Sequence, residues 1–447
     1  MLAIVVSRAD DASVHIGEHL RDLEDWSVDR DDSRSDAQGG GDIWRLPDVE
    51  LREFDTAHLE LEDAAEAFDD PDLLVFASKH AGDTGKLLTA HHTGNFGPAE
   101  YGGADHALAR ACPAAHRRVV QALGEHAPDD YEIGMECTHH GPTEVGVPSM
   151  FVEVGSAQPQ WDDPDAARAV AKAILDLRGV SPDAPREDGT RRHLVGFGGG
   201  HYVPRFERIV RETDWAVGHI AADWCLDAMG DPAVHHEVIR ATFEESAADF
   251  ALLADERPGL RDVLDDLGFR VVDETFLRET TGVSLDVVER VEDALGSVES
   301  GTRLGEHAAD FEGGIEIVPL PGALREQVQG IDQDEARTAV ERHTVGFETE
   351  ASGTRLGERV VVTDSAERRA IIETFATILE SKYDEVEIED DTVVAHETAF
   401  VPEKARALGI SEGPTFGKLS AGQSVEVGGR TIPPEAVHEQ RVHRFPI

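Results

Sequence analysis

Apolar and polar positions follow two patterns in the first half of the chain: short apolar runs and longer amphipathic stretches. The apolar runs have strand length and lie at residues 2–6, 73–78, 87–90, 131–137, 149–155, 193–197 and 215–220. Stretches with helical spacing lie between them, at residues 104–112, 114–127 and 165–177. Short strands separated by amphipathic helices predict an α/β fold, with a mixed or parallel sheet flanked by helices.

Other parts of the chain lack these patterns. The acidic segment 28–42, which ends in consecutive glycines, predicts a surface loop or an insertion. After about residue 271 histidines become rare, and the heptapeptide SGTRLGE at 300–306 recurs at 352–358. The recurrence indicates a small duplicated unit, unless it is a chance match of a loop sequence. We therefore predict a catalytic domain over residues 1–300 and a smaller acidic α+β extension over residues 301–447, whose role stays open.

Charge sets the chain apart from ordinary globular proteins. Its 447 residues include 90 acidic and 41 basic side chains, which give a formal net charge of −49. Such a surface repels itself in dilute salt, whereas about 1 M salt shortens the Debye length to roughly 3 Å and screens the repulsion. The composition therefore predicts a protein of a halophilic archaeon. The charge describes the solvent and does not exclude a nucleic-acid partner.

The location is predicted from what the sequence lacks. No run approaches the roughly 18 apolar residues that a membrane span needs, and the first twenty residues lack the basic start of a signal peptide. The three cysteines, Cys112, Cys137 and Cys225, have no metal or redox spacing, which favours buried thiols in a reducing compartment. We expect a cytoplasmic protein that does not bind membranes.

Histidines stand at the ends of several predicted strands: His80, the pair His91–His92, the pair His139–His140, and His201. Ligands of open α/β sheets bind outside the carboxyl ends of the strands, so we expect these loops to meet in one crevice. Imidazole suits zinc, and Glu136 and Glu153 add carboxylates nearby. The cluster predicts a metal-dependent hydrolase that activates water. Metal-free acid–base catalysis by histidine is the alternative.

A glycine-rich run at residues 196–200 precedes His201. Such a run lets the backbone approach a ligand closely, although a tight turn would need the same glycines. It lacks the Gly-Lys-Ser/Thr ending of a phosphate-binding loop. Tyr202 and Arg205 follow it, and they are candidates for stacking on a base and for contacting a phosphate.

These segments together resemble the archaeal and plant type of zinc-dependent D-aminoacyl-tRNA deacylases. The matching pieces lie in order over residues 1–295: Ser78-Lys79-His80, LTAHHTGN at 88–95, Tyr101-Gly102-Gly103, THHGPTEVGVPSMFVEVGS at 138–156 with Trp161, VGFGGGHYVPRF at 195–206, and Gly218-His219-Ile220. The resemblance implies a phosphorylase/hydrolase-like α/β fold and hydrolysis of the ester between a D-amino acid and the terminal ribose of tRNA. It also implies about two Zn²⁺ ions per subunit. The region beyond about residue 300 lies outside these motifs and is expected to be a halophile-type extension.

The resemblance, taken with the chemistry of ester hydrolysis, gives working roles to the motif residues. Candidate catalytic residues are Lys79, His80, His140, Thr143 and His201, with Lys79 or the amides near Gly199–Gly200 facing the oxyanion. Candidate metal ligands are His91, His92, His139, Glu136 and Glu153. Candidate substrate-binding residues are Asn95, Gly198, Gly199, Gly200, Tyr202 and Arg205. The division of the histidines between metal binding and proton transfer stays open.

Other functions compete with this interpretation. A metal-dependent hydrolase or phosphorylase of a small molecule would use the same pocket, and a non-catalytic RNA- or metal-binding protein would use the histidines only as ligands. The expected partner is tRNA charged with a D-amino acid, not DNA, and the expected state is a monomer. Residues 409–419 and 422–425 are similar to a segment of zinc-dependent tRNA 3′-processing endonucleases, whose metal motif is absent. We expect a structural hairpin with Gly428–Gly429 at its turn there, with a role in holding tRNA as the alternative.

Overall fold

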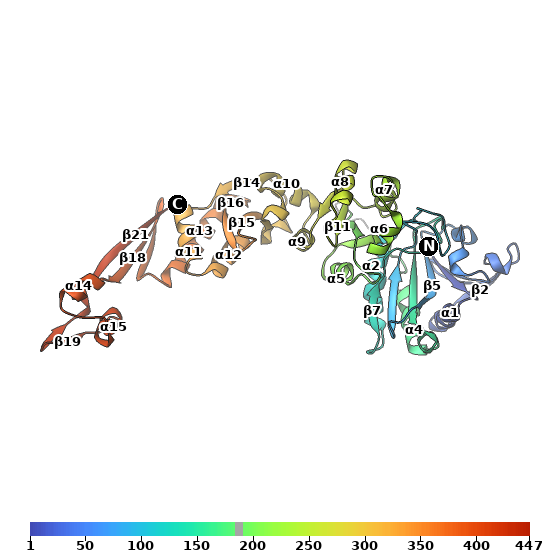
Figure 1. The fold of residues 1–447 in the computed structure, drawn as a ribbon, viewed down its shortest axis with the longest axis horizontal. Helices are drawn as coiled ribbons and strands as arrows, with labels where there is room; N and C mark the ends of the chain where they lie inside the picture. Colours follow the sequence, from blue (N-terminus) through green and yellow to red (C-terminus); the bar gives the residue numbers. More distant parts are fainter. Residues whose placement is uncertain (184–190) are drawn as a thin grey trace. The chain divides into compact units, whose positions relative to one another are not determined.

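The computed structural model describes residues 1–183 and 191–447, which form two compact units, Met1–Thr281 and Gly282–Ile447 (Figure 1). The division comes earlier than the boundary predicted near residue 300. The reason is α10 (Leu285–Leu295), which packs against strands of the second unit. No helix among the described residues is long and apolar enough to cross a bilayer.

A mixed sheet with the strand order β2-β3-β4-β1-β5-β8-β6-β7 forms the centre of the first unit. Its strands are β1 (Leu2–Ser7), β2 (Ser27–Asp31), β3 (Gly41–Leu46), β4 (Val49–Phe54), β5 (Leu73–Ala81), β6 (Leu87–His91), β7 (Glu132–Met135) and β8 (Ser149–Ser156). Strands β4, β1, β5 and β8 run parallel, whereas β6 is antiparallel to β8. The predicted α/β fold with a mixed sheet is confirmed.

A second sheet in this unit is entirely parallel, with the order β10-β9-β11-β12. Its strands are β9 (His193–Phe197), β10 (Ala216–Ala221), β11 (Phe250–Leu253) and β12 (Arg270–Val272). The helices of the unit are α1 (Asp11–Leu23), α2 (Pro113–His126), α3 (Gln158–Trp161), α4 (Pro164–Leu175), α5 (Pro204–Glu212), α6 (Asp223–Met229), α7 (His236–Glu244), α8 (Pro258–Leu267) and α9 (Glu274–Glu279). The strands predicted at 193–197 and 215–220 thus belong to a different sheet from those before them.

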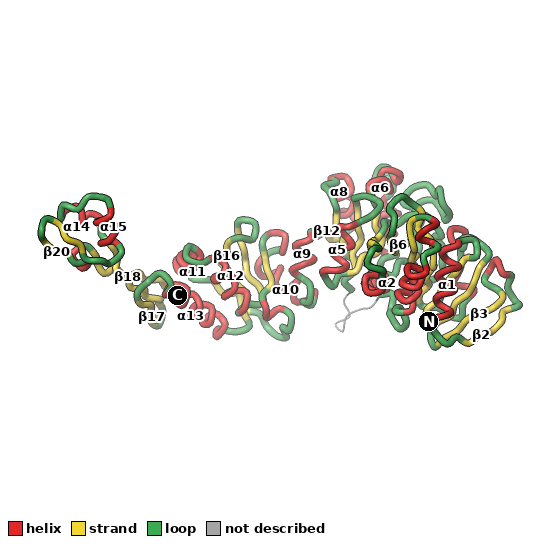
Figure 2. The backbone as a smooth tube through the Cα atoms, turned by 90° about the horizontal axis from the view of Figure 1, so that it is seen from below, coloured by secondary structure: helices red, strands yellow, loops and turns green. Residues whose placement is uncertain are grey.

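The two faces of the first sheet have different coverings. Helices α1 and α2 each contact α4, and α1, α2 and α4 pack on β5, β6 and β8 respectively (Figure 2). Because successive side chains of a strand point to opposite faces, alternate residues such as Val5, Phe76 and Phe151 point to the face that these helices do not cover. There they join a buried core with the segment 61–68. The polar site described below continues this second face.

One prediction of local structure was wrong, and a second was right only in part. Residues 104–112 form a loop and not a helix, because Leu108 makes a bridge with Gly94 and the Ala109 N–H donates to the carbonyl of Thr93. In the acidic segment 28–42, residues 32–40 form the predicted loop, whereas the two ends belong to β2 and β3. Its aspartates pair with arginines of the neighbouring strands, as Asp29 does with Arg45 at 2.6 Å.

The second unit is α+β and antiparallel. Its sheets have the orders β13-β15-β16-β14 and β17-β18-β21, and β19 pairs with β20. The strands are β13 (Thr302–Leu304), β14 (Glu316–Pro319), β15 (Gly346–Glu350), β16 (Arg355–Val362), β17 (Glu385–Glu389), β18 (Thr392–Phe400), β19 (Val425–Val427), β20 (Arg430–Ile432) and β21 (His438–Pro446). Besides α10, the helices are α11 (Gly322–Gln329), α12 (Gln333–Arg342), α13 (Ser365–Glu380), α14 (Pro402–Ala407) and α15 (Pro414–Ser420). The expected hairpin at Gly428–Gly429 is present, with both glycines at positive φ.

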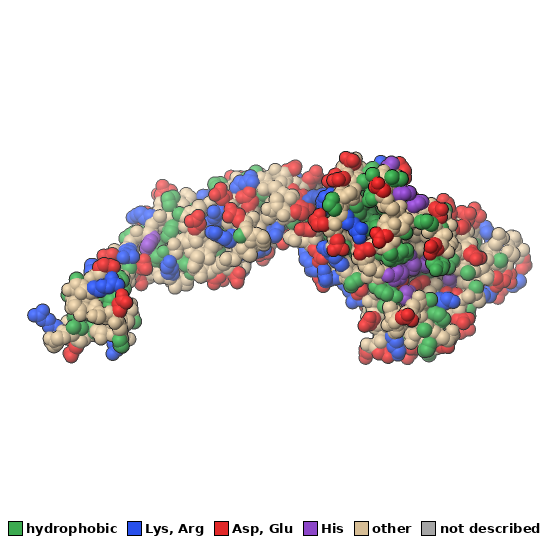
Figure 3. Space-filling model, in the orientation of Figure 1, with side chains coloured by type: hydrophobic (Ala, Val, Ile, Leu, Met, Phe, Trp, Pro, Cys, Tyr) green, Lys and Arg blue, Asp and Glu red, His purple; other side chains and the backbone are tan. Residues whose placement is uncertain are grey.

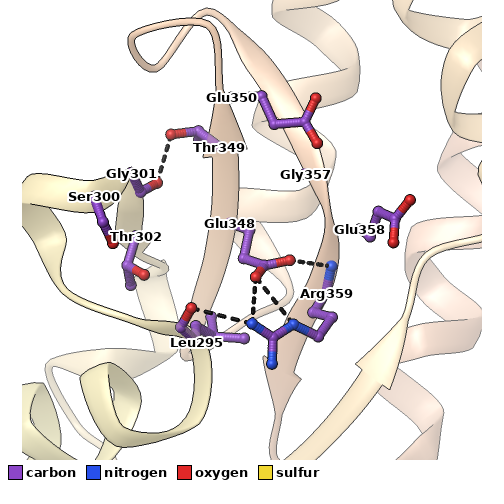
Figure 4. A pocket seen from close by; sticks show the side chains of 10 residues that line it. All are labelled: Leu295, Ser300, Gly301, Thr302, Glu348, Thr349, Glu350, Gly357, Glu358 and Arg359. Carbon is purple, nitrogen blue, oxygen red and sulfur yellow. Dashed lines mark hydrogen bonds and ion pairs between the residues drawn. The ribbon is translucent and has the colours of Figure 1, made fainter.

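The two copies of the SGTRLGE heptapeptide lie on either side of β15. One copy contains β13 and the other contains the start of β16, and both strands pair antiparallel with β15. Between them is a polar hollow of about 270 Å³ (Figure 4), across which Arg359 Nη2 donates to Glu348 Oε1 at 2.6 Å. The copies therefore share one strand instead of building two separate units.

Candidate active site

The strand register brings His80, His91 and Glu153 to one face of the first sheet. His80 of β5 lies opposite Gly155 of β8, and His91 of β6 lies opposite Phe151 of β8. Residues 151, 153 and 155 alternate onto the same face, so Glu153 lies between the two imidazoles. A Cβ atom on Gly155 would lie 2.7 Å from His80 Cδ2, so glycine makes room for this ring.

The loop after β7 brings the remaining histidines to the same place. The Cys137 N–H donates to the carbonyl of His201 at 2.9 Å, and the Thr138 N–H donates to the carbonyl of Ile220 at 2.8 Å. These bonds join the end of β7 to the segments that follow β9 and end β10. As a result Glu136, His139, His140 and His201 come from loops that the two sheets fix against each other.

His139 is the centre of the cluster. Its ring lies 4.3 Å from that of His91, 4.4 Å from that of His140 and 4.6 Å from that of His201. The ring of Phe151 packs below His91 and His140. Figure 3 shows histidine side chains gathered at the surface of the first unit. His201 keeps 32% of its side chain exposed. The predicted convergence holds for His80, His91, His139, His140 and His201. The location differs from the predicted crevice at the carboxyl ends of the strands. Because β6 runs antiparallel to β8, the cluster lies on a face of the sheet.

Three imidazoles form a group with ligand atoms within 4.8 Å of one another: His91, His139 and His140. In each ring Nδ1 lies within hydrogen-bond distance of a backbone carbonyl oxygen, at 3.1, 2.8 and 2.7 Å respectively. A carbonyl accepts only from N–H, so these contacts place the proton on Nδ1 and leave Nε2 with its lone pair. Metal-bound histidines are held by the same kind of contact. Nε2 of His91 is buried and has no hydrogen-bond partner among the described residues.

A second group contains His80, Glu136 and Glu153, again with ligand atoms within 4.8 Å. His80 Nδ1 lies 3.2 Å from Glu136 Oε1 and 3.6 Å from Glu153 Oε2. The Glu136 contact is an ion pair without hydrogen-bond alignment, so this buried oxygen has no hydrogen-bond partner in the described chain. Contacts of 3.8 Å join the two groups, from His139 Nε2 to Glu136 and from His91 Nε2 to Glu153.

Electrostatics separates the histidines into two kinds. Burial, followed by the charge of His91, lowers the pKa of His140 to about 4 and that of His139 well below its usual range. Burial also acts to lower the pKa of His80, but Glu136 and Glu153 outweigh it and raise that pKa to about 11. Burial acts to raise the pKa of Glu136, but His201 and His80 hold it well below its usual range. Burial also acts to lower the pKa of His91, but Glu153 outweighs it and raises that pKa. The cluster thus offers the neutral imidazoles of His139 and His140 and ionised carboxylates, the forms that bind metal ions, whereas His80 and His91 carry protons that a bound metal ion would displace.

Two contacts orient the histidines at the edge of the site. His201 Nε2 lies 2.7 Å from Glu136 Oε2, and His80 Nε2 lies 2.8 Å from the Tyr202 hydroxyl. Tyr202 was a candidate for stacking on a base, yet its hydroxyl belongs to the histidine network. His201 also lies 3.8 Å, through Nδ1, from the Cys137 thiol. A hydrogen bond with Cys225 and burial raise the pKa of that thiol, so it is a weaker candidate ligand than the imidazoles.

The metal-ligand role expected for His92 is corrected by its contacts. Its Nδ1 lies 3.2 Å from the carbonyl oxygen of Gly218, and its Nε2 accepts the N–H of Cys112 at 3.2 Å. Both ring nitrogens therefore have backbone partners, and no lone pair remains for a metal. Adjacent residues of an extended segment point in opposite directions, which takes His92 away from the face that His91 occupies.

Two further site expectations, for Lys79 and Arg205, are not supported by the geometry. Lys79 alternates onto the sheet face opposite His80, where its Nζ lies 5.2 Å above the Trp161 ring, so it is not placed as an oxyanion donor. Arg205 donates to Glu274 at 2.6 Å and to the carbonyl of Ala254 at 2.7 Å, contacts that occupy the guanidinium expected to bind phosphate.

Asn95 and Thr143 have structural contacts beside the cluster. The Asn95 amide donates to the carbonyls of Gly102 and Ala104, and the Thr143 hydroxyl accepts the Ala104 N–H. Both therefore hold the loop 101–104 in place rather than reaching into the site.

The glycine-rich loop forms the tight turn that the sequence allowed. Gly198 and Gly199 have positive φ, and their N–H groups donate to the Ala221 carbonyl and to Asp223 Oδ1. Those two amides are therefore engaged within the fold, which argues against the expected anion contact at Gly199. Asp223 itself, and Trp224 next to it, were not expected from the sequence. No spacing distinguishes them, because only the fold brings α6 beside His201.

The fold and the cluster define a class: an α/β enzyme whose active site is built from buried imidazoles and carboxylates on one face of a mixed sheet. The family model for D-aminoacyl-tRNA deacylase matches residues 67–272. A D-aminoacyl-tRNA deacylase from Haloarcula marismortui is 55% identical over 449 residues, covering 100% of both chains. The chain belongs to the D-aminoacyl-tRNA deacylase family.

More distant relatives extend the comparison. A D-aminoacyl-tRNA deacylase from Methanococcoides burtonii is 31% identical and covers 98% of this chain and 95% of its own. The second unit is therefore not confined to haloarchaeal relatives, as a halophile-type extension would be. A crystal structure of a conserved protein of unknown function matches with a TM-score of 0.55 and 25% identity, covering 63% of this chain and 98% of that chain.

Proposed function

We propose that the chain hydrolyses the ester between a D-amino acid and the terminal ribose of tRNA, with zinc held by the two side-chain groups of the cluster. The relatives support the reaction, because proteins that match this chain over 95% or more of their own length are named D-aminoacyl-tRNA deacylases. The acidic surface and the haloarchaeal relatives support action in molar salt. Because the substrate is charged tRNA, the place of action is the cytoplasm.

One observation carries the metal assignment. The three imidazoles of His91, His139 and His140 each have Nδ1 on a backbone carbonyl, and their ligand atoms lie within 4.8 Å of one another. An imidazole anchored in this way presents Nε2 as a ligand, and a catalytic zinc typically takes three protein ligands. We assign one ion to this group and a second to His80, Glu136 and Glu153. The donor set fits, because Nε2 of His91 and Oε1 of Glu136 are buried without hydrogen-bond partners in the described chain.

Bound zinc supplies a Lewis acid and a water of lowered pKa at the ester. The side chains of the chain then determine how the ester is held and where protons go. His201 is the group that we assign to proton transfer, because 32% of its side chain is exposed. Glu136 fixes the orientation of its ring through Nε2 and stabilises the imidazolium that forms when the ring takes up a proton.

The experiment that tests the reaction compares enantiomers. The protein is incubated at molar salt with zinc and with D-tyrosyl-tRNA or L-tyrosyl-tRNA, and release of the amino acid is measured. We expect rapid loss of the D-ester and survival of the L-ester. Intact D-ester under these conditions would contradict the proposal. Equal hydrolysis of a simple D-tyrosine ester and of D-tyrosyl-tRNA would favour a small-molecule hydrolase instead.

A further inference from the structure

Two exposed aromatic side chains stand out in the described chain. Among its large hydrophobic side chains that face solvent, Tyr101 and Trp224 are the aromatic ones. Trp224 keeps 49% of its surface exposed, and its ring lies 6.4 Å from that of His201 with the planes 23° apart. Tryptophan is among the side chains that most often dominate the energy of binding a partner. An exposed tryptophan beside the exposed histidine of the cluster therefore indicates a ligand contact.

The backbone that carries Trp224 is fixed. Helix α6 follows β10 directly, and the N–H of Asp223 donates to the carbonyl of Gly199 at 2.9 Å. In return, Asp223 Oδ1 accepts the Gly199 N–H at 3.1 Å. Cys225, Leu226 and Met229 bury the opposite face of the helix. The indole thus projects from a rigid element at a set position relative to His201, as a stacking platform requires.

The inference rests on the proposed function, whose substrate carries its ester on the last ribose of an unpaired 3′ end. The base of that nucleotide is attached to the same ribose, so it lies close to the ester. We propose that Trp224 stacks on the base of the nucleotide that carries the ester, and that this contact places the ester against His201. Aromatic rings take unpaired bases in this way, since every base has a stacking face. Tyr202, the residue expected to stack, has its hydroxyl on His80 instead.

The test separates the base from the amino acid. Wild type, Trp224→Ala and Trp224→Phe are assayed at molar salt with zinc on D-tyrosyl-tRNA, D-alanyl-tRNA and D-tyrosine ethyl ester. Because losing a base–aromatic stack is worth about 1–3 kcal/mol, we expect Trp224→Ala to lower kcat/KM on both tRNA esters by about 5- to 100-fold, mainly through KM. Trp224→Phe retains most of the activity, and the ethyl ester, which has no base, is cleaved as by wild type.

A matched control is Val28→Ala, which removes an exposed apolar side chain from the edge strand β2. It should leave all three rates unchanged. A second readout does not depend on turnover: adenosine monophosphate should quench the part of the tryptophan fluorescence that is lost in Trp224→Phe. Failure of wild type to cleave any D-aminoacyl-tRNA would contradict the proposed function, whereas this quenching tests the stacking by itself.

Several outcomes would overturn the stacking. Trp224→Ala with wild-type kcat/KM on both tRNA esters would show that the ring contributes nothing to binding. A loss confined to D-tyrosyl-tRNA would place the amino-acid side chain, and not the base, on the indole. An equal loss on the ethyl ester would mean that the ring only supports the cluster. Absence of quenching by adenosine monophosphate, in a protein that cleaves D-aminoacyl-tRNA, would also contradict the proposal.

Discussion

His201 Nε2 lies 2.7 Å from Glu136 Oε2, although the two residues follow strands of different sheets. The Glu136 side chain is fully buried, whereas 32% of the His201 side chain is exposed. This contact therefore links the buried carboxylate to the part of the cluster that solvent and substrate reach. It also makes the cluster depend on the position of one sheet against the other within the first unit.

Replacing Glu136 by glutamine tests this link. The substitution keeps the shape of the side chain and removes the charge that raises the pKa of His80 and orients His201. Losing a carboxylate that orients a site histidine typically costs about 10- to 100-fold in metal affinity or activity, so we expect kcat/KM for D-tyrosyl-tRNA to fall by about that factor. Glu132→Gln, at the exposed start of β7, the strand that Glu136 follows, is the control and should keep full activity. Wild-type rates for Glu136→Gln would rule out a catalytic role for the carboxylate.

Tyr202→Phe removes only the hydroxyl that contacts His80 Nε2 at 2.8 Å. A hydrogen bond of this kind contributes about 1 kcal/mol, so kcat/KM should fall roughly fivefold while the melting temperature changes little. Tyr131→Phe removes a similar 3.0 Å contact, with Asp163, away from the histidines. It should leave the rate unchanged. If both variants behave alike in steady-state assays, the Tyr202 hydroxyl has no special role.

Two glycine-to-alanine changes should have opposite effects on stability. A Cβ atom on Gly141 would overlap the backbone of Gly102 and Gly103, so the loop that carries His140 would have to move. We expect the free energy of unfolding to fall by about 1–3 kcal/mol and the activity to be lost, as overpacking predicts. Gly124 lies inside α2 with no atom near its would-be Cβ, and alanine there should stabilise by about 0.5–1 kcal/mol. Denaturant unfolding measures both, and a stable, active Gly141→Ala would contradict the packing.

His116 should make the fold sensitive to acid. Burial lowers its pKa to about 4, so the native state holds it neutral while the unfolded chain protonates it near its ordinary value of 6.5. Its contribution is therefore complete above pH 6.5 and is lost as the pH falls from 6.5 towards 4, by roughly 3 kcal/mol. His116→Leu should flatten the loss of stability over this range by a similar amount. His236→Leu, at an exposed site, is the control. An unchanged pH profile for His116→Leu would show that another group carries the effect.

The fold class could be predicted because most of its strands and helices have clear hydrophobic periodicity. The strands at 73–78 and 149–155 and the helices at 114–127 and 165–177 have clear periodicity, and each is present. Residues 104–112 have helical spacing, but they form a bridge with Gly94 and a backbone hydrogen bond with Thr93, because tertiary hydrogen bonds outweigh a weak local preference. Segment 28–42 resembles a loop because its strand is stabilised by ion pairs across the edge of the sheet instead of by apolar contacts.

Individual roles were beyond the sequence, because they depend on which way a side chain points. His91 and His92 are adjacent and chemically identical, yet one faces the cluster and the other has both ring nitrogens on the backbone. Lys79 is next to His80 but alternates to the other face of the sheet. The helix that carries Trp224 reaches His201 only through the packing of β9 and β10. Such relationships have no signature in the local sequence.

The measurement that tests the central claim most directly is zinc-dependent turnover by a protein of known metal content. The chain is stripped with a chelator, its zinc is measured by mass spectrometry, and hydrolysis of D-tyrosyl-tRNA is followed as zinc is returned. We predict no turnover in the stripped protein, recovery with about two equivalents of zinc, and no recovery in His140→Ala, which should bind less metal. Full hydrolysis by stripped protein, or by His140→Ala, would contradict the account.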